Sequence, residues 1–440
     1  MKLWRCIICG EIFEGDEPPE ICSVCGAPAE EFELYEEKEV TFSSDIDEKI
    51  VIIGNNAAGI SAMEAIRKRN SIASITVIDK DQSYAYYRPS LSDYLSNSHD
   101  EGRFYLHNND WYQENNINLL LGYLVTEIDK DNKKVILENM EEVEYDKLIL
   151  ANGSYNYVPP IEGIDKEGVF SIKTLSDANN VKEYAKRCRK VAVIGGGLLG
   201  LEASWELKKL GLDITVIEMA SRILPKQLDE EGSQIFERGI NKTGIIIHKN
   251  VTAKAIVGDN KVTGVQIMDG SIVDVDMVVL SIGVRANTKL AKDSGILISR
   301  SVIVDENMKT NIDNIYAAGD VCEIDGINYS IWAEAIEQGK IAGANAVGDN
   351  IIYKKIIPNN IFNGMNMSIF SIGDLGINEN TSYTCIMQED KDNLLYKKLY
   401  FVDDIFVGGI LIGDISKSSN MISGIEQKLN LKQMVNEIIL

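Results

Sequence analysis

Residues 190–200 read Lys-Val-Ala-Val-Ile-Gly-Gly-Gly-Leu-Leu-Gly. The apolar run predicts a buried strand, the glycines a tight turn, and the two leucines the start of a helix. A second apolar stretch, 213–217, ends in Glu218. In a strand–turn–helix–strand unit of this kind, the pyrophosphate of a dinucleotide lies over the helix N-terminus and the acid binds ribose hydroxyls. The candidate dinucleotide-binding residues are Gly195, Gly197, Leu198, Leu199, Gly200, Glu218 and Gly283.

The acid at the end of the second strand also bears on the choice of nucleotide. A carboxylate at this position favours the free 2′-hydroxyl of NADH over the 2′-phosphate of NADPH. Arg222 follows Glu218 by four residues and could face a phosphate, so NADPH stays as the less favoured alternative.

An earlier stretch repeats the pattern. Residues 49–53 form an apolar run, residues 54–59 read Gly-Asn-Asn-Ala-Ala-Gly, and residues 74–78 form a second apolar run that ends in Asp79. Asn56 stands where the fingerprint has its second glycine, and we expect it to crowd the approach of a ligand to the backbone. Two such units about 140 residues apart indicate one electron carrier that hands electrons to another.

Four further segments, taken in order, resemble the FAD-dependent pyridine-nucleotide oxidoreductases of the glutathione-reductase type over about residues 49–350. They are 87–92, 148–153, Thr310 with 315–320, and 332–348. The resemblance implies that the first unit binds FAD, that Asp320 bonds its ribityl chain, and that the inserted second unit binds NADH. The FAD residues it implies are Gly54, Ala57, Ala58, Gly59, Asp79, Arg88, Pro89, Ala151, Gly153, Gly319 and Asp320.

Four of the seven cysteines lie within the first 25 residues, in two Cys-x-x-Cys-Gly pairs: Cys6 with Cys9, and Cys22 with Cys25. Each pair can present two thiolates from one tight turn, and four thiolates suit either zinc or iron. The spacing alone does not choose between the two metals. So short a segment also draws folding energy from its metal.

This N-terminal segment resembles the rubredoxin-like domain of rubrerythrins. The similarity rests on the cysteine pairs, Trp4, Gly15 and residues 18–20, whereas Ser23 stands where rubredoxins often have proline. The resemblance implies one iron and one-electron transfer. A zinc ion that only stabilises the segment remains the alternative.

The region expected near the flavin contains no cysteine. Relatives that reduce disulfides or peroxides carry one there, but residues 90–95 read Ser-Leu-Ser-Asp-Tyr-Leu, which disfavours those reactions. Cys188, Cys322 and Cys385 are expected to be core thiols.

Glu202 matches an acid that lies near the nicotinamide in relatives and often pairs with a lysine. It is the one tentative catalytic residue. Asp93 occupies the position of that lysine here, and Lys173 could approach from elsewhere. The alternative is that Glu202 is a helix-face residue with a local partner.

The motifs divide the chain into regions. We expect a rubredoxin-like metal domain, a solvated acidic linker, an FAD-binding domain in two parts with an NAD-binding domain between them, and an α+β C-terminal domain. That last region, with strands over 394–400 and 406–412 and one helix over 421–440, resembles the C-terminal domain of NADH:rubredoxin oxidoreductases. The metal domain is expected over 1–35 and the linker over 36–48. The two parts of the FAD-binding domain are expected over 49–157 and 278–355, the NAD-binding domain over 158–277, and the C-terminal domain over 356–440.

The amino-acid composition limits the classes of partner that the chain could bind. The 440 residues carry 67 acids and 44 bases, a net charge of −23, which disfavours nucleic acid because phosphate binding needs clustered cations. Neither a signal peptide at the N-terminus nor a membrane-spanning stretch is evident. We expect a cytoplasmic protein, and a homo-oligomer is left open.

The predicted function is electron transfer from NADH to FAD and then, one electron at a time, to the tethered iron centre. A downstream redox protein, such as one that reduces oxygen or peroxide, is the expected acceptor. Two alternatives are an NADH–FAD reductase or oxidase with another acceptor and a structural zinc, and a redox-sensing flavoprotein.

Overall fold

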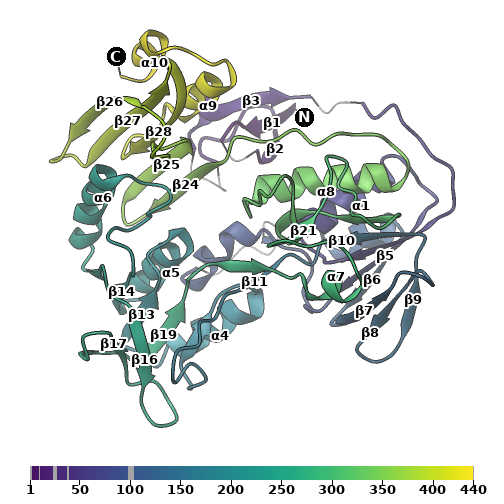
Figure 1. The fold of residues 1–440 in the computed structure, drawn as a ribbon, viewed down its shortest axis with the longest axis horizontal. Coiled ribbons are helices and arrows are strands. Elements are labelled where there is room, and N and C mark those ends of the chain that lie inside the picture. The colour runs from purple at the N-terminus through teal and green to yellow at the C-terminus, as the bar shows by residue number, and fades with distance from the viewer. Residues whose placement is uncertain (1, 9, 23–26, 37–38, 98–103, 440) are drawn as a thin grey trace.

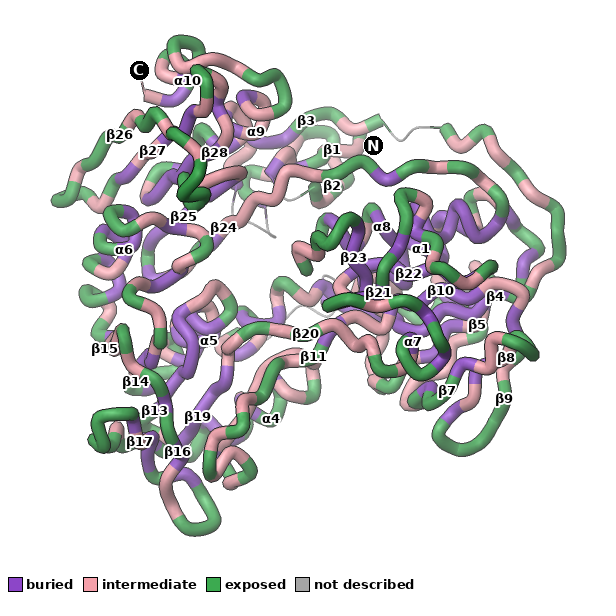
Figure 2. The backbone as a smooth tube through the Cα atoms, in the orientation of Figure 1, coloured by how far each residue is buried: buried purple, intermediate pink, exposed green. Residues whose placement is uncertain are grey.

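The computed structural model describes residues 2–8, 10–22, 27–36, 39–97 and 104–439. Two α/β units lie side by side, and a C-terminal domain lies beside the second unit (Figure 1). The N-terminal strands pack next to that C-terminal domain, although they stand at the other end of the sequence. Figure 2 shows the buried backbone concentrated in the central strands of both units.

The first unit is built on a parallel sheet of strand order β22-β10-β4-β5-β6. Its apolar strands are buried on both faces, as expected for a parallel sheet covered by helices. The strands are β4 (Lys49–Ile53), β5 (Ser74–Asp79), β6 (Ile117–Leu121), β10 (Lys147–Leu150) and β22 (Ile315–Ala317).

Two helices of this unit approach each other unusually closely. They are α1 (Ala57–Arg67) and α8 (Trp332–Ala346). A side chain on Gly339 would place its Cβ 2.2 Å from the carbonyl oxygen of Ala58, so glycine is required at the contact. Helix α8 is thereby held against the first turn of α1.

Smaller elements complete the first unit. An antiparallel sheet, β7-β8-β9, and short helices surround the main sheet. The elements are η2 (Arg88–Leu91), η3 (Asp93–Leu95), α3 (Asn109–Glu114), β7 (Val125–Asp129), β8 (Lys134–Leu137), β9 (Glu142–Glu144), α7 (Lys289–Asp293), β21 (Val302–Ile303), η4 (Gly319–Val321) and β23 (Cys322–Glu323).

The second unit repeats the design, with the parallel strand order β12-β19-β13-β14-β15. An antiparallel sheet, β16-β17-β18, extends from it. The elements are β12 (Val169–Ser171), α4 (Leu175–Ala185), β13 (Lys190–Ile194), α5 (Leu198–Lys209), β14 (Asp213–Ile217), α6 (Glu230–Lys242), β15 (Ile246–His248), β16 (Ala253–Val257), β17 (Gly264–Ile267), β18 (Ile272–Asp274) and β19 (Met277–Leu280).

An antiparallel ribbon of β11 (Ser154–Asn156) and β20 (Val284–Ala286) joins the two units, so the chain leaves the first sheet and returns to it side by side. Strand β19 pairs with β13 as far as Leu280. The boundary expected at 277 therefore falls inside a strand of the second sheet and moves beyond residue 280.

The C-terminal domain is an antiparallel sheet of order β24-β25-β28-β27-β26 with two helices packed on it. The expected single helix over 421–440 is wrong, because the chain turns after α9 and Asn430 caps a separate helix. The elements are β24 (Asn359–Gly364), β25 (Met367–Gly373), β26 (Thr384–Asp390), β27 (Leu395–Val402), β28 (Ile405–Ile412), α9 (Ser418–Glu426) and α10 (Leu431–Ile438).

The N-terminal segment forms a small antiparallel sheet, β2-β1-β3, with one short 3-10 helix. Its apolar residues belong to the same buried cluster as the interior of the C-terminal domain. The elements are β1 (Lys2–Cys6), β2 (Ile12–Gly15), η1 (Ala29–Glu31) and β3 (Phe32–Tyr35).

The acidic linker is less solvated than expected. Phe42 packs against the core of the first unit, and the Ser44 amide donates to the carbonyl oxygen of Arg69 at 2.8 Å. The linker therefore lies on the first unit over its second half, where Phe42 is its one aromatic residue.

The predicted α/β class with two Rossmann-like units is confirmed by the two parallel sheets. Over the described residues, no helix combines the length and apolar character needed to cross a bilayer.

Candidate functional site

The first glycine turn links β4 to α1 and leaves no room for side chains. Gly54 has φ +118°, and a Cβ there would lie 2.2 Å from the carbonyl oxygen of Ala151, the residue that follows β10. A Cβ on Gly59 would lie 2.0 Å from the carbonyl oxygen of Gly54. Both glycines are therefore fixed by the packing of the turn against the sheet.

Asn56 has a structural role in this turn. Its side-chain oxygen accepts hydrogen bonds from the amides of Ala58 and Gly59, so it caps α1, and its amide nitrogen donates to Ala151 at 2.6 Å. Ala57 and Ala58 form the first, buried turn of the helix. The asparagine side chain thus serves as a helix cap, and the expected crowding of a ligand stays a prediction.

Asp79 ends β5 beside the glycine turn. One carboxylate oxygen accepts from the Asn55 amide at 2.6 Å, and the other accepts from the Asp81 amide at 2.9 Å. Burial raises the pKa of Asp79, and the two backbone hydrogen bonds oppose that rise. The carboxylate is thus held in one orientation next to the start of α1.

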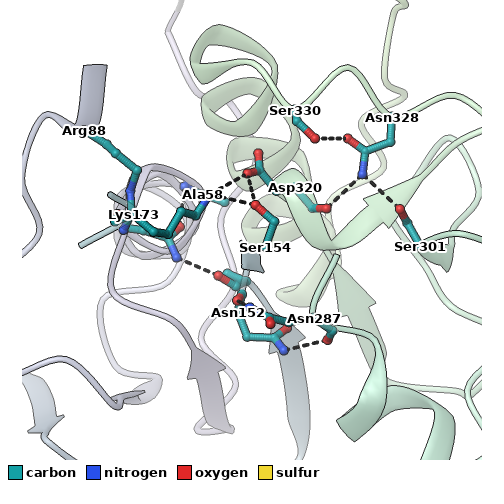
Figure 3. A network of polar contacts seen from close by, with 12 residues as sticks. Ala58, Arg88, Asn152, Ser154, Lys173, Asn287, Ser301, Asp320, Asn328 and Ser330 are labelled. Atoms are coloured by element: carbon teal, nitrogen blue, oxygen red, sulfur yellow. Dashed lines mark hydrogen bonds and ion pairs between the residues drawn. The ribbon is translucent and has the colours of Figure 1, made fainter. Parts of the chain in front are cut away.

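A polar network joins the first unit to the chain entering the second (Figure 3). The Lys173 ammonium donates to Ser154 Oγ at 2.7 Å and lies 3.4 Å from Asp320 Oδ2. Ser154 Oγ in turn donates to Asp320 at 2.6 Å. Burial lowers the pKa of Lys173, while the charge of Asp320 opposes that shift. Ser154 lies on β11, Asp320 in the 3-10 helix η4, and Lys173 in the segment before α4.

Arg88 and Pro89 start the short helix η2 on the other side of the same network. The Arg88 guanidinium donates to the backbone oxygen of Lys173 at 2.7 Å and lies over the ring of Tyr86. Gly319, with φ +79°, begins η4, and its amide donates to Gln338 Oε1 at 2.8 Å. Segments 87–92 and 315–320 therefore both contribute to one region, to which Gln338 of α8 also bonds.

Asn152 and Gly153 complete this region. Asn152 and Asn287 exchange amide-to-carbonyl hydrogen bonds, which hold the outgoing and returning chains together. Gly153 has φ +61°, and nothing lies within 4 Å of a Cβ built on it. Its backbone conformation, rather than crowding, calls for glycine.

Several buried polar atoms here have no partner among the described residues. They are Asn55 Nδ2, Asn152 Oδ1 and Trp332 Nε1, each on a segment expected to hold FAD. Buried donors and acceptors are rarely left unsatisfied in native proteins. Such atoms suit a bound cofactor rich in hydroxyl, carbonyl and phosphate groups, so the residues present fit FAD.

The second glycine turn has the same construction. Gly195 has φ +114°, and a Cβ there would lie 2.1 Å from the carbonyl oxygen of Ser281. A Cβ on Gly200 would lie 2.1 Å from the Gly195 oxygen. Glu218 follows β14, and its carboxylate accepts from the amides of Gly196 and Ala220, each at 2.6 Å. This carboxylate has the same place as Asp79 in the first unit.

The remaining candidates of the second unit lie around this turn. Gly197 precedes α5, and no atom lies within 4 Å of a Cβ built on it. Leu198 packs on the core, whereas Leu199 is exposed. Gly283 has φ +98° and open space beside it. Exposed backbone at the N-terminus of a helix fits the pyrophosphate of a nucleotide.

Arg222 is engaged within its own loop. Its guanidinium donates to the backbone oxygens of Leu228 and Pro225, both at 3.1 Å. The side chain that could have faced a 2′-phosphate is thus directed to carbonyl groups.

Glu202 lies on α5 facing η3. Its carboxylate accepts from Ser92 Oγ at 3.1 Å, and one helical turn later Glu206 accepts from Ser96. Burial raises the pKa of Glu202 to about 7; the Ser92 hydrogen bond lowers it and the charges of Asp93 and Glu206 raise it further. Lys173 bonds Ser154 and Asp320 instead, so serine takes the place expected for a lysine beside Glu202.

The N-terminal cysteines are described in part. Cys6 and Cys22 are buried in one apolar cluster, while Cys9 and Cys25 lie outside the described residues. Two buried thiols brought together from separate Cys-x-x-Cys pairs form a soft donor set that fits iron or zinc.

The single cysteines differ from one another. Cys322 is buried and its thiol lies 3.4 Å from the Gly319 oxygen; burial raises its pKa far above the ordinary value. Burial also raises the pKa of the partly buried Cys188 to about 11. Cys385 is exposed on β26, so the expectation that it is a core thiol is wrong. That strand is at the edge of its sheet, and most of its side chains are exposed.

Two polar groups were missed from the sequence. Ser154 gave no signal beyond its place after Gly153. Asp229, which precedes α6, accepts from Tyr396, Lys398 and Tyr400 of the C-terminal domain at 2.7, 2.5 and 2.9 Å. This cluster, the Asp229 cluster, joins residues far apart in sequence, so no local pattern could reveal it.

Comparison with known families accounts for most of the chain. Residues 48–344 match the family model described as "Pyridine nucleotide-disulphide oxidoreductase". Residues 358–429 match "Rubredoxin NAD+ reductase C-terminal domain", and residues 4–33 match "Rubrerythrin, rubredoxin-like domain".

Individual relatives cover the chain to different extents. The "Nitrite reductase [NAD(P)H]" of Bacillus subtilis is 34% identical over 88% of this chain and 48% of its own length. The "NADH-rubredoxin oxidoreductase" of Clostridium acetobutylicum is 31% identical over 87% of this chain and 98% of its own. The chain spans about half the length of the two Bacillus subtilis relatives it matches.

Solved structures share the fold. The crystal structure of NADH:rubredoxin oxidoreductase from Clostridium acetobutylicum has a TM-score of 0.76 and 29% identity, covering 89% of this chain and all of that one. The ferredoxin reductase for the CYP199A2 system from Rhodopseudomonas palustris has a TM-score of 0.81 at 22% identity, covering 88% of this chain and 97% of that one.

Proposed function

We propose that this chain, which belongs to the pyridine nucleotide-disulphide oxidoreductase family, transfers electrons from NADH through FAD to an iron ion held by its own N-terminal cysteines. One observation carries the proposal. The chain combines a C-terminal domain of the rubredoxin-reductase kind with a rubredoxin-like segment, and the two share one buried apolar cluster. A reductase and a matching acceptor are thus parts of one molecule.

The first unit is assigned to FAD. Helix α1 presents its N-terminus to the pyrophosphate, and Asp79 accepts from ribose hydroxyls. The network of Ser154, Lys173 and Asp320 would hold the ribityl chain, with the Asp320 carboxylate as the acceptor for a ribityl hydroxyl. Asn55, Asn152 and Trp332 supply donors and acceptors that have no partner among the described residues.

The second unit is assigned to NADH. Helix α5 presents its N-terminus to the pyrophosphate, and Glu218 accepts from the 2′- and 3′-hydroxyls of the adenosine ribose. Because the Arg222 guanidinium already bonds two backbone oxygens, the loop offers little to a 2′-phosphate. NADPH is the less favoured nucleotide.

When bound, FAD would supply hydride acceptance from NADH and release of single electrons, and an iron ion held by Cys6, Cys9, Cys22 and Cys25 would take one electron at a time. Overall, one NADH and two ferric ions give NAD+, one proton and two ferrous ions. The chain's own residues bind, orient and exclude water. Glu202 lies beside the expected nicotinamide site with Ser92 as its partner, and no residue is required to move a proton for the hydride step.

The proposal also covers the onward electron acceptor and the cellular location. The expected onward acceptor is a redox protein that takes single electrons, such as one that reduces oxygen or peroxide. Reduced cysteine thiolates at a metal site are typical of the cytoplasm, which we propose as the location. Measurement of the molecular mass in solution would define the oligomeric state.

Metal analysis and the visible spectrum of the purified protein test the assignment. We expect one iron and one FAD per chain, with a ferric-thiolate absorption that disappears in Cys9→Ser. Stoichiometric zinc without that absorption would contradict the electron-transfer role and favour a structural metal with another acceptor.

A further inference from the structure

Two donors hold the Asp320 carboxylate through one of its oxygens. Ser154 Oγ donates to Oδ2 at 2.6 Å, and the Lys173 ammonium lies 3.4 Å from the same oxygen (Figure 3). The two donors also contact each other, because the ammonium donates to Ser154 Oγ at 2.7 Å. Within the described ranges, no other cation lies within 4 Å of this carboxylate, and Oδ1 accepts no hydrogen bond. Because the Asp320 side chain is 22% exposed, Oδ1 is available to a ligand.

The main chain around Lys173 is fixed from both α/β units. Its carbonyl oxygen accepts from the Arg88 guanidinium at 2.7 Å, and its amide donates to Asp177 of α4 at 3.1 Å. Two residues later, the Leu175 amide donates to the hydroxyl of Tyr86 at 3.0 Å. A lysine side chain loses much rotational freedom when its ammonium is placed, so a fixed main chain helps hold the ammonium beside its partner.

The main chain around Asp320 is also fixed. Its carbonyl oxygen accepts from Asn328 Nδ2 at 2.8 Å, and Asn328 Oδ1 in turn accepts from the Ser330 hydroxyl at 2.8 Å. The preceding amide, that of Gly319, donates to Gln338 Oε1 at 2.8 Å. The ion pair therefore joins two segments of main chain that other hydrogen bonds already hold in place.

The charge of this ion pair bears on the redox state of the cofactor. Hydride transfer from NADH brings one negative charge to FAD, because the nucleotide leaves as NAD+. A nearby carboxylate disfavours that charge, whereas a nearby cation offsets it. Arg88 is a second cation of this region, but its guanidinium bonds the backbone oxygen of Lys173 and lies over the ring of Tyr86. The Lys173 ammonium is thus the charge that balances Asp320.

We propose that Lys173 is a positioning residue for FAD. Together with Ser154 it holds Asp320 so that one carboxylate oxygen is left for the ribityl chain, and its charge balances that carboxylate so that the reduced flavin is favoured. This inference rests on the binding of FAD to the first unit, as proposed above.

Release of FAD from the loaded full chain tests the positioning. Ser154→Ala removes the hydroxyl that joins the ammonium to the carboxylate, while Ser176→Ala changes an exposed serine on α4 and is the control. Flavin fluorescence after serial dilution gives the dissociation constant of FAD. We expect Ser154→Ala to raise that constant by about tenfold or more, and Ser176→Ala to leave it within about twofold of the wild type. Equal constants for the two variants would overturn the positioning role.

The ratio of reduced to oxidised flavin at a fixed potential tests the charge. The full chain, loaded with metal and with excess FAD, is reduced slowly by xanthine and xanthine oxidase with a reference dye present. Lys173→Met should lower the ratio by about tenfold or more, which is about 30 mV for a two-electron couple. Lys173→Arg keeps the charge and should stay within about threefold of the wild type. Lys186→Met, which removes a largely exposed lysine after α4, should change nothing.

The same ratio for Lys173→Met and Lys186→Met would overturn the charge role, because a merely structural lysine would leave the potential unchanged. Lys173→Gln takes the place of Lys173→Met if the methionine variant does not retain FAD, and Ser154→Ala decides the positioning in either case. Reduction in this assay does not use NADH. A wild-type flavin that NADH fails to bleach would therefore refute the proposed function, while the ratio would still decide the role of Lys173.

Discussion

Glu202→Gln should change the way in which the stability of the protein depends on pH. The pKa of Glu202 is raised from 4.5 to about 7, chiefly by burial. The folded state therefore binds a proton more readily than the unfolded state. Between these values, stability falls as pH rises, because the buried carboxyl must give up its proton in the folded state.

The size of the effect follows from the same shift. A rise from 4.5 to about 7 corresponds to at most roughly 3 kcal/mol. Glutamine has the same shape and does not titrate. Relative to the wild type, Glu202→Gln should gain stability as pH rises through this window, and the gain should be complete above about pH 7.

Variants of two residues next to Glu202 test what sets its pKa. Ser92→Ala removes the hydrogen bond that favours the ionised form, so it should move the pKa of Glu202 upward. Asp93→Asn removes a like charge and should move it downward.

The assay is thermal unfolding of the FAD-loaded protein, followed by flavin fluorescence at several pH values. The informative quantity is the difference in midpoint between wild type and Glu202→Gln, because the other titrating groups cancel. A difference that stays constant from about pH 5 to about pH 8 would refute the reasoning.

Three other changes probe the glycine turn, the domain contact and the metal. Gly59→Ala should abolish FAD binding, as seen in the flavin-to-protein absorbance ratio, because its Cβ would lie 2.0 Å from the Gly54 oxygen; full FAD content would contradict this. Asp229→Ala removes the nearer carboxylate from the largely buried Lys398, leaving Glu231 at 3.4 Å, and should cost up to about 3–5 kcal/mol in chemical unfolding; a cost below about 1 kcal/mol would argue against it. Cys9→Ser should preserve flavin reduction by NADH but slow cytochrome c reduction, and equal loss of both rates would contradict the order of transfer.

The sequence predicted best what is encoded locally. Each Rossmann-like unit was predicted because its strand, glycine turn and terminal acid fall within about 30 residues, and the structure places Asp79 and Glu218 on the amides beside their turns. Gly54 and Gly195 are also determined locally, because the turn itself requires their positive φ angles.

Contacts between distant segments could not be predicted. The Asp229 cluster joins residues 167 to 171 positions apart, and none of its members stands in a recognisable motif. Glu31 looked like one acid among many in an acidic segment, yet it is only 2% exposed in the folded chain. Phe42 shows the same effect in the linker, where one aromatic residue decides which part of the chain is anchored.

The glycine pattern of the fingerprint does not reveal the role of Asn56. Its side chain replaces a glycine of the fingerprint but caps α1, a role that depends on the conformation of the turn. Cys385 was assigned to the core because free cysteines are usually buried, and its place on an edge strand overrides that tendency.

An anaerobic titration of the purified protein with NADH, following the flavin and ferric-thiolate bands together, tests the central claim most directly. The account predicts that NADH bleaches both bands and that the ferric band returns after cytochrome c is added as a one-electron acceptor. Bleaching of the flavin band alone, with the metal absorption unchanged at excess NADH, would contradict it.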